Sequence, residues 1–167
     1  MGRRFRGESN HKVDGKGRVS IPAPFRRVLE EGDPDWTPGA NPNLVLVYGR
    51  KGRRCLEGYS MTSMEAVDDM VSALPRYSRE REILERMLNT QSTYAQVDEN
   101  GRMVLSPRLR ELVGVTNEAT FAGMGDKFQI WEPKAFEADM TAIDSWLDEQ
   151  PSENDPFALL DALPRSG

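Results

Sequence analysis

One stretch of this sequence occurs twice: it reads Lys12-Val13-Asp14-Gly15-Lys16-Gly17-Arg18-Val19-Ser20-Ile21-Pro22 first and Gln96-Val97-Asp98-Glu99-Asn100-Gly101-Arg102-Met103-Val104-Leu105-Ser106 later. The offset is 84 residues, whether it is counted from Asp14 to Asp98 or from Arg18 to Arg102. Each copy contains an apolar residue, an Asp, two turn-forming residues, a Gly, an Arg and a short apolar run. A repeat of this length predicts a duplicated folding unit that places Asp and Arg in the same way twice.

The residues around each copy predict the same order of elements in both halves. Apolar and polar residues alternate as in half-buried strands, and the Gly in the centre predicts a turn. A short helix led by proline follows, and it should end at Gly32 in the first half and Gly114 in the second. A hairpin and a longer helix complete each half. The expected strands cover 9–13, 18–21, 44–48, 55–59, 93–97, 102–104, 119–122 and 128–131.

Two longer helices and a basic turn lie between the repeats. Thr62 with Glu65 three residues later has the pattern of a capping box, which predicts a helix over 62–74. A second helix should begin at Ser78. The basic segment 49–54 is expected to be a solvated hairpin tip.

The fold class expected from these elements is α+β. A few strands of about five residues each cannot bury themselves without a partner sheet. The two halves should therefore pack as an intramolecular pseudo-dimer around a small mixed β-barrel with short helices. We divide the chain into a first repeat, a connecting helix, a second repeat and an acidic tail that we expect to be disordered; the segments are 5–75, 76–92, 93–150 and 151–167.

Charge is distributed unevenly along the chain. The net charge of the 167 residues is −5, which argues superficially against a nucleic-acid partner. Residues 1–29, however, hold eight basic and two acidic residues, a local net charge of +6, whereas 132–167 hold nine acidic and two basic residues. The first copy of the repeat thus lies in the most basic part of the chain.

The repeated turn has two interpretations. Asp14 and Asp98 can accept hydrogen bonds from turn amides and pair with Arg18 and Arg102, which would make both pairs turn-stabilising and nothing more. Gly17 and Gly101 would supply the positive φ that such turns often need. In the alternative interpretation, the turns present basic and amide side chains to an anion, since Arg suits both phosphate and the major-groove edge of guanine. The residues presented would be Lys16, Arg18, Asn100 and Arg102.

Several other classes of protein are disfavoured. His11 is the only histidine and Cys55 the only cysteine, so no catalytic triad, disulfide framework or thiolate metal cluster is expected. No phosphate-binding glycine motif is present, and no apolar segment approaches the roughly 18 residues that span a bilayer. We therefore expect that the protein is not an enzyme and that it binds no cofactor, metal or membrane. We expect a cytoplasmic location.

The motifs resemble one family closely. Arg6-Gly7, the segment Asp14–Pro22 and Phe25-Arg26 resemble the N-terminal signature of MraZ proteins, and the segments 98–102 and 105–110 resemble that family's second copy. The resemblance covers about residues 5–150. It implies the AbrB-like swapped-hairpin DNA-binding fold, with two interleaved units in one chain.

The resemblance also implies a function. It suggests a sequence-specific transcriptional regulator that binds double-stranded promoter DNA of the cell-division and cell-wall gene cluster, including its own gene, as a ring-shaped homo-oligomer associated with the nucleoid. The expected DNA-binding residues are Arg6, Lys16, Arg18, Asn100 and Arg102, and the turn-shaping residues are Asp14, Gly17, Asp98 and Gly101. The alternatives are an antitoxin-type regulator on the AbrB-like fold and a protein-interaction module.

Overall fold

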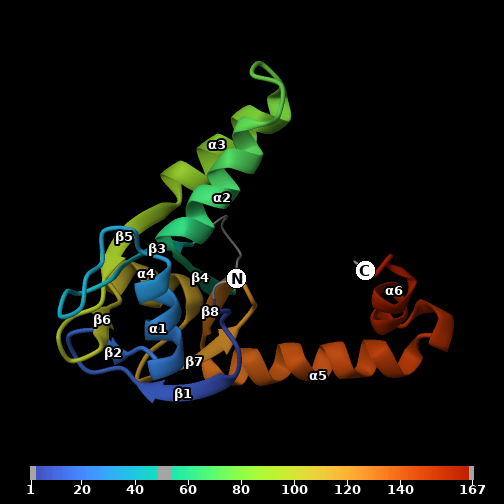
Figure 1. Ribbon diagram of the computed structural model, residues 1–167. Helices are drawn as coiled ribbons and strands as arrows, with labels where there is room; N and C mark the ends of the chain where they lie inside the picture. The colour runs from blue at the N-terminus through green and yellow to red at the C-terminus, as the bar shows by residue number, and fades with distance from the viewer. Residues whose placement is uncertain (1–2, 49–53, 166–167) are drawn as a thin grey trace. The chain divides into compact units, whose positions relative to one another are not determined.

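The computed structural model describes residues 3–48 and 54–165, which form two compact units that meet in the chain at residues 133 and 134 (Figure 1). The segment 49–53 of the expected basic hairpin tip lies outside the described residues. The elements of the first unit are β1 (Glu8–Lys12), β2 (Arg18–Ser20), α1 (Ala23–Glu31), β3 (Asn43–Val47), β4 (Cys55–Ser60), α2 (Met61–Ser72), α3 (Arg79–Thr90), β5 (Ser92–Gln96), β6 (Arg102–Val104), α4 (Pro107–Val113), β7 (Glu118–Gly123) and β8 (Lys127–Trp131). The second unit contains α5 (Pro133–Glu149), the 3-10 turn η1 (Ser152–Asn154) and α6 (Pro156–Ala162). The α+β class is confirmed.

Most strand pairs join the two halves of the chain. The six-stranded sheet has the order β1-β7-β8-β4-β3-β5, in which only the hairpins β3–β4 and β7–β8 pair strands of the same half. The pairs β1–β7, β3–β5 and β4–β8 each combine one strand from either half. The separate β2–β6 ribbon does the same. Because every one of these pairings is antiparallel, the expectation of a mixed barrel is wrong in that respect.

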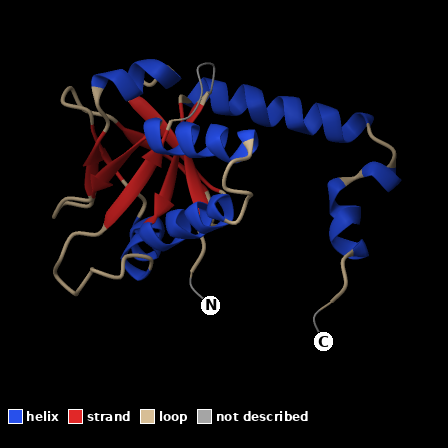
Figure 2. Ribbon diagram, turned by 90° about the horizontal axis from the view of Figure 1, so that it is seen from above, coloured by secondary structure: helices blue, strands red, loops and turns tan. Residues whose placement is uncertain are grey.

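The apolar run in β3 is buried on both faces of the sheet. Leu44 and Leu46 belong to the main core, whereas Val45 and Val47 belong to a second cluster with Tyr59. This division follows from the period of two in a strand, which sends successive side chains to opposite faces. Helix α1 adds its buried side chains to the main core, and α2 adds Met64 to the second cluster. Helices accordingly flank the strands in Figure 2.

Four phenylalanine rings from both halves form the centre of the main core. Phe5 lies edge-on to Phe25 and Phe128, with ring centroids 5.3 and 5.1 Å apart, and Phe121 stacks on Phe128 at 5.8 Å. Aromatic pairs of this kind are worth about 0.5–1.5 kcal/mol beyond the area they bury. Gly58 in β4 lets the Phe128 ring approach closely, since a Cβ atom there would overlap the ring. The core thus depends on contacts that neither half makes alone.

Helix ends agree with the sequence in three places and differ in one. Helix α1 is capped at its C-terminus by Gly32 and α4 by Gly114, and α3 follows the N-cap Ser78. The capping box expected at Thr62 is wrong: Ser60 caps α2 instead, its Oγ accepting from the backbone N–H of Ser63 at 3.1 Å. Strand β4 runs straight into α2 without a loop, so the last strand residue serves as the cap.

The tail contains more structure than expected. The sequence predicts disorder over residues 151–167, yet η1 and α6 lie within them. The cause is local: the Asp155 carboxylate accepts from the backbone N–H of Phe157 at 2.9 Å, and Pro156 occupies the first helical position. Within the described residues, no helix is both long and apolar enough to cross a membrane.

Candidate nucleic-acid interface

The first repeated turn is closed by Asp14. Its Oδ1 accepts from the backbone N–H groups of Lys16 and Arg18, both at 2.9 Å, and its Oδ2 accepts from Arg18 Nε at 2.6 Å. The Gly17 N–H donates to the Asp14 carbonyl at 2.9 Å, and Gly17 has φ of +82°. The carboxylate is thus engaged within the turn, while the Arg18 side chain remains 38% exposed.

The second turn repeats this backbone geometry with a looser arginine. Asp98 Oδ1 accepts from the N–H groups of Asn100 at 2.8 Å and Arg102 at 2.9 Å, and Gly101 has φ of +76°. Arg102 Nε, however, lies 3.9 Å from Asp98 Oδ2, which is an ion pair but not a hydrogen bond. Within the described residues this buried Nε has no hydrogen-bond partner. Arg102 is therefore less tightly held than Arg18.

Hydrogen bonds to the turn keep both carboxylates ionised. The backbone hydrogen bond from Arg18, followed by its side-chain hydrogen bond, lowers the pKa of Asp14 to about 2. The backbone hydrogen bond from Arg102 is the largest cause that lowers the pKa of Asp98, and the charge of Arg18 contributes as well. The charge of Arg18 thus acts on both carboxylates.

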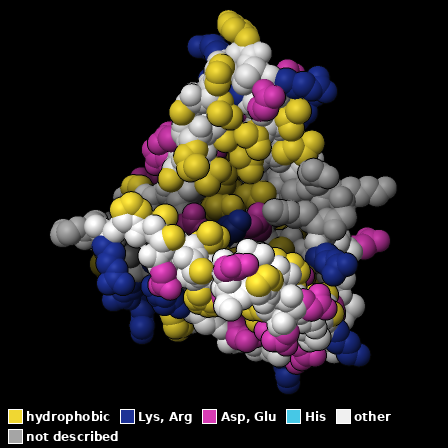
Figure 3. Space-filling view, turned by 90° about the vertical axis from the view of Figure 1, so that its right-hand side faces the viewer, with side chains coloured by type: hydrophobic (Ala, Val, Ile, Leu, Met, Phe, Trp, Pro, Cys, Tyr) yellow, Lys and Arg dark blue, Asp and Glu magenta, His cyan; other side chains and the backbone are white. Residues whose placement is uncertain are grey.

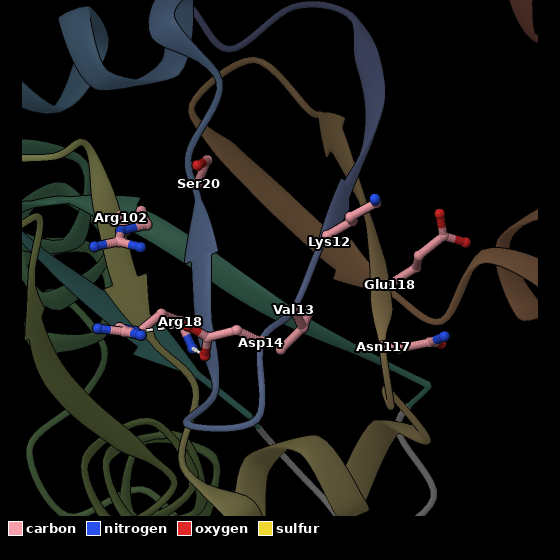
Figure 4. Close-up of a pocket in the computed structure, with 8 residues that line it drawn as sticks. All are labelled: Lys12, Val13, Asp14, Arg18, Ser20, Arg102, Asn117 and Glu118. Carbon is pink, nitrogen blue, oxygen red and sulfur yellow. Dashed lines mark hydrogen bonds and ion pairs between the residues drawn. The ribbon is translucent and has the colours of Figure 1, made fainter.

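The β2–β6 ribbon carries both arginines on one face. Val19 lies opposite Met103 at its centre, and both side chains are buried. Arg18 is paired with Val104, and Arg102 with Ser20. Since side chains alternate along a strand, Arg18 and Arg102 lie on the face opposite the buried Val19 and Met103. Figure 4 shows the two arginine side chains extending to the same side from neighbouring strands. The ribbon therefore presents two guanidinium groups from related positions in the two halves.

An open pocket of about 450 Å³ lies beside the ribbon. Its lining combines the first turn, the two ribbon arginines and the neighbouring ends of β1 and β7 (Figure 4). The residues are Lys12, Val13, Asp14, Arg18, Ser20, Arg102, Asn117 and Glu118.

Two arginines without an expected role support the turns from the opposite half. Arg26 of α1 lies across the second turn, where a Cβ atom on Gly101 would overlap Arg26 Nη1. Arg110 of α4 lies across the first turn, 3.2 Å through its Nε from the position of a Cβ on Gly17, and this Nε donates to the Leu105 carbonyl at 3.0 Å. Arg26 and Arg110 are also 84 residues apart, so they occupy equivalent positions in the two copies. This equivalence could have identified both arginines from the sequence.

The remaining expected residues lie apart from the pocket of the two arginines. Lys16 and Asn100 occupy exposed positions at the tips of their turns. Arg6 lies before β1, at the opposite end of that strand from the first turn, and lines a different pocket. Gly101 and Asp98 line a third pocket, of about 270 Å³, together with Arg26 and the loop that carries Trp36.

His11 has a structural environment. Its Nε2 lies 2.8 Å from the Ser9 hydroxyl, its ring packs edge-on against Phe121, and burial lowers its pKa. Among the described residues, no group of three or more His, Cys, Asp or Glu side chains is arranged to hold a metal ion.

The comparison with known proteins decides the family. The family model described as "MraZ protein, putative antitoxin-like" matches residues 4–86 and again 88–154. The chain belongs to the MraZ family. Two curated relatives named transcriptional regulator MraZ, from Ruegeria pomeroyi and from Ruegeria sp. strain TM1040, are each 54% identical over 162 residues, which is 96% of this chain and 97% of the relative. A third, from Cereibacter sphaeroides strain ATCC 17025, is 46% identical over 149 residues, covering 85% of this chain and 88% of the relative.

Membership in the MraZ family confirms the resemblance seen in the repeated motifs. It also confirms the broad class of function, because MraZ proteins are transcriptional regulators and not enzymes. The two matched segments each contain one copy of the Asp-x-x-x-Arg turn.

Proposed function

We propose that this protein regulates transcription by binding double-stranded DNA in a sequence-specific manner through the β2–β6 ribbon. The observation that carries the proposal is the pair Arg18 and Arg102, which point from one face of a ribbon built equally by both halves. Asp14 orients the Arg18 guanidinium through a hydrogen bond, and Asp98 forms a looser ion pair with Arg102. A preoriented guanidinium loses less conformational freedom when it binds.

The chemistry of these side chains suits the major groove. A two-stranded ribbon fits the groove's width of about 12 Å, and an arginine can donate to guanine O6 and N7 together. Asn100, at the exposed tip of the second turn, has the side chain that pairs with adenine, and Lys16 at the corresponding tip suits a phosphate. Arg6 remains a proposed DNA contact outside this ribbon.

We also propose that the two halves form a pseudo-dimer of swapped-hairpin units. The reciprocal pairs β1–β7 and β3–β5 support this arrangement, because in each the strand before a repeated turn pairs with the first hairpin strand of the other half. A two-fold relation between Arg18 and Arg102 favours DNA with related half-sites of opposite direction. The segments 5–75, 76–92, 93–150 and 151–167 remain the proposed division of the chain.

The proposed target is the promoter of the cell-division and cell-wall gene cluster, including this protein's own gene, in the cytoplasm at the nucleoid. A ring-shaped homo-oligomer would present many ribbons at once and favour DNA with repeated sites through effective concentration. Large exposed apolar side chains on α2, α3, their connection and β5 support self-association, and hydrophobic atoms gather over the upper part of the molecule in Figure 3. The exposed apolar residues on these elements are Met70, Tyr77, Ile83, Leu84 and Tyr94.

A mobility shift assay tests this function. DNA from upstream of the protein's own gene should bind more tightly than scrambled DNA of equal length at two salt concentrations, and affinity should rise as one, two and three copies of a short site are included. Equal affinity for upstream and scrambled DNA would show that the ribbon reads no sequence. An affinity that does not rise with copy number would show that the ribbons of an oligomer do not bind repeated sites together.

The description of the family as antitoxin-like keeps a second candidate function in view. An antitoxin-type regulator or protein-interaction module would use its surface to hold a protein partner. Gel filtration separates the two, since a plain dimer favours the antitoxin-type protein and a large ring favours the proposed regulator.

A further inference from the structure

A second basic pocket lies away from the ribbon. It has a volume of about 390 Å³ and is lined by Arg3, Arg4, Arg6, Pro24, Arg27 and Val28. Three of the arginines precede β1, and the fourth belongs to α1. The ribbon's first turn follows the opposite end of β1. The five residues of that strand span roughly 16 Å, which corresponds to about five base pairs of duplex.

The arginines of this pocket are poorly compensated by acidic groups. Arg3 Nε lies 3.7 Å from Glu31 Oε1 in an exposed ion pair. Within residues 3–48 and 54–165, Arg4, Arg6 and Arg27 form no ion pair. Gathering four guanidinium groups in a protein whose net charge is −5 creates a local positive potential that attracts anions.

The chain segment that carries Arg4 and Arg6 is fixed to the rest of the protein at Phe5. Phe5 is 1% exposed, and its backbone pairs with Gly125 through two hydrogen bonds of 2.7 and 3.0 Å. Arg4 and Arg6 flank this buried residue and are exposed. The Arg4 guanidinium also lies against Gly125, with Nη2 2.7 Å from where a Cβ atom would stand. The positive groups are thus held near one another rather than free on a loose terminus.

We propose that this basic pocket binds phosphate groups of the DNA backbone, beside the base pairs that the ribbon reads. The inference rests on the proposed function of the ribbon. Arginine is suited to phosphate because it donates two parallel hydrogen bonds. The pocket is open and its arginines are spread over two segments, which fits a continuous strand of phosphates better than one enclosed small ligand.

This role separates affinity from specificity. Phosphate contacts strengthen binding and make it sensitive to salt, but they carry no direct sequence information. Removal of the pocket arginines should weaken binding to every DNA sequence equally. Removal of the ribbon arginines should instead abolish discrimination between sequences.

The test compares two triple variants of the full chain with equal changes in charge. Arg4→Gln/Arg6→Gln/Arg27→Gln removes the three arginines without ion pairs from the pocket. The control, Arg76→Gln/Arg79→Gln/Arg86→Gln, removes three exposed arginines at the α2–α3 connection and on α3. Affinity for upstream and scrambled DNA is measured between about 50 and 200 mM salt, where counterion release dominates. Circular dichroism verifies that both variants are folded, and gel filtration that both keep the oligomeric state of the wild type, because the control residues lie on the surface proposed for self-association.

We expect the slope of log affinity against log salt to become shallower by about 0.9 for each phosphate that the variant can no longer bind, or roughly 2–3 in all for one protomer on DNA. The ratio of affinities for upstream and scrambled DNA should change less than about twofold, and Arg4→Lys/Arg6→Lys/Arg27→Lys should keep most of the slope because it keeps the charge. A slope that changes no more than in the control overturns the proposal. The proposal is also overturned if the ratio of affinities for upstream and scrambled DNA falls to one while the salt slope is unchanged. These residues would then contact bases rather than phosphates.

Free tripolyphosphate distinguishes the source of the phosphate. If calorimetry shows that it binds the wild type and not the pocket variant, while the DNA slopes of the two are equal, the pocket serves a small anion and the proposal is wrong. If the wild type fails to prefer upstream DNA, the proposed function of the ribbon fails. The salt slope then still reports whether the pocket meets phosphates.

Discussion

At the scale of single residues, Asp and Arg of the repeated turn have different roles. Asp14 and Asp98 accept backbone amides inside their turns, which lowers the pKa of both carboxyls. Arg18 and Arg102 reach outward from the ribbon. The sequence could predict the Asp contacts because they span four residues or fewer. It could not show that Arg26 lies against Gly101, since that contact depends on how the halves interleave.

The depressed pKa of Asp14 predicts a dependence of stability on pH. The pKa is about 2 in the folded protein against a usual 3.8, so the stabilisation from the ionised carboxylate is complete above the usual value and is lost as pH falls toward 2. Asp14→Asn should lower Tm at pH 7. The difference in Tm between this variant and the wild type should become smaller as the pH falls below about 4. Melting curves at several pH values check this, with Glu99→Gln at the exposed second turn as the control. A gap that persists unchanged at a pH of about 2.5 would refute the role of the ionised form.

The close approach of Arg26 predicts an unusual cost for a methyl group on Gly101. Gly101→Ala should destabilise the protein by about 1–3 kcal/mol more than Gly39→Ala, because both glycines have positive φ but only Gly101 faces a neighbouring side chain. Removing that neighbour in Gly101→Ala/Arg26→Ala should recover part of the difference. Urea unfolding of the wild type, Gly101→Ala, Arg26→Ala and the double variant forms a double-mutant cycle. Strictly additive effects would mean that the two residues do not interact.

At the scale of elements, short-range patterns predicted most helices and strands, and long-range pairing did not follow from them. The related positions of α1 and α4 are visible in the repeat, as are the turns between β1 and β2 and between β5 and β6. Which strands become neighbours is set by contacts more than a hundred residues apart, as between β1 and β7. The start of α2 could not be predicted because β4 reaches it without a loop, so that Ser60 belongs to a strand and caps a helix at once.

The cap of α2 gives a direct comparison of two residues. Ser60→Ala should cost about 1 kcal/mol of stability, since the hydroxyl oxygen accepts the Ser63 amide. Thr62→Ala, within the first turn and exposed, should cost clearly less. Chemical denaturation of both variants decides between them. A larger destabilisation at Thr62 would restore the capping box.

At the scale of the whole molecule, the two halves should unfold together. Their strands are intermixed in one sheet, and the aromatic centre of the core takes Phe5 and Phe25 from one half and Phe121 and Phe128 from the other. Trp36 reports on the first half and Trp131 on the second. In single-tryptophan proteins that keep one or the other, with Trp146 replaced by Phe in both, the fluorescence transitions in urea should coincide with circular dichroism. An earlier transition at Trp36 would mean that the halves are separate folding units.

The proposed function depends above all on sequence recognition by the two arginines of the β2–β6 ribbon. The decisive experiment compares Arg18→Ala/Arg102→Ala with the control Arg79→Ala/Arg86→Ala, using the ratio of affinities for upstream and scrambled DNA together with Tm. We expect the ribbon variant to remain folded and its ratio to fall by at least about tenfold, as the removal of base-contacting arginines requires, while the control keeps the ratio. A folded ribbon variant with an unchanged ratio would show that these arginines do not read the DNA sequence.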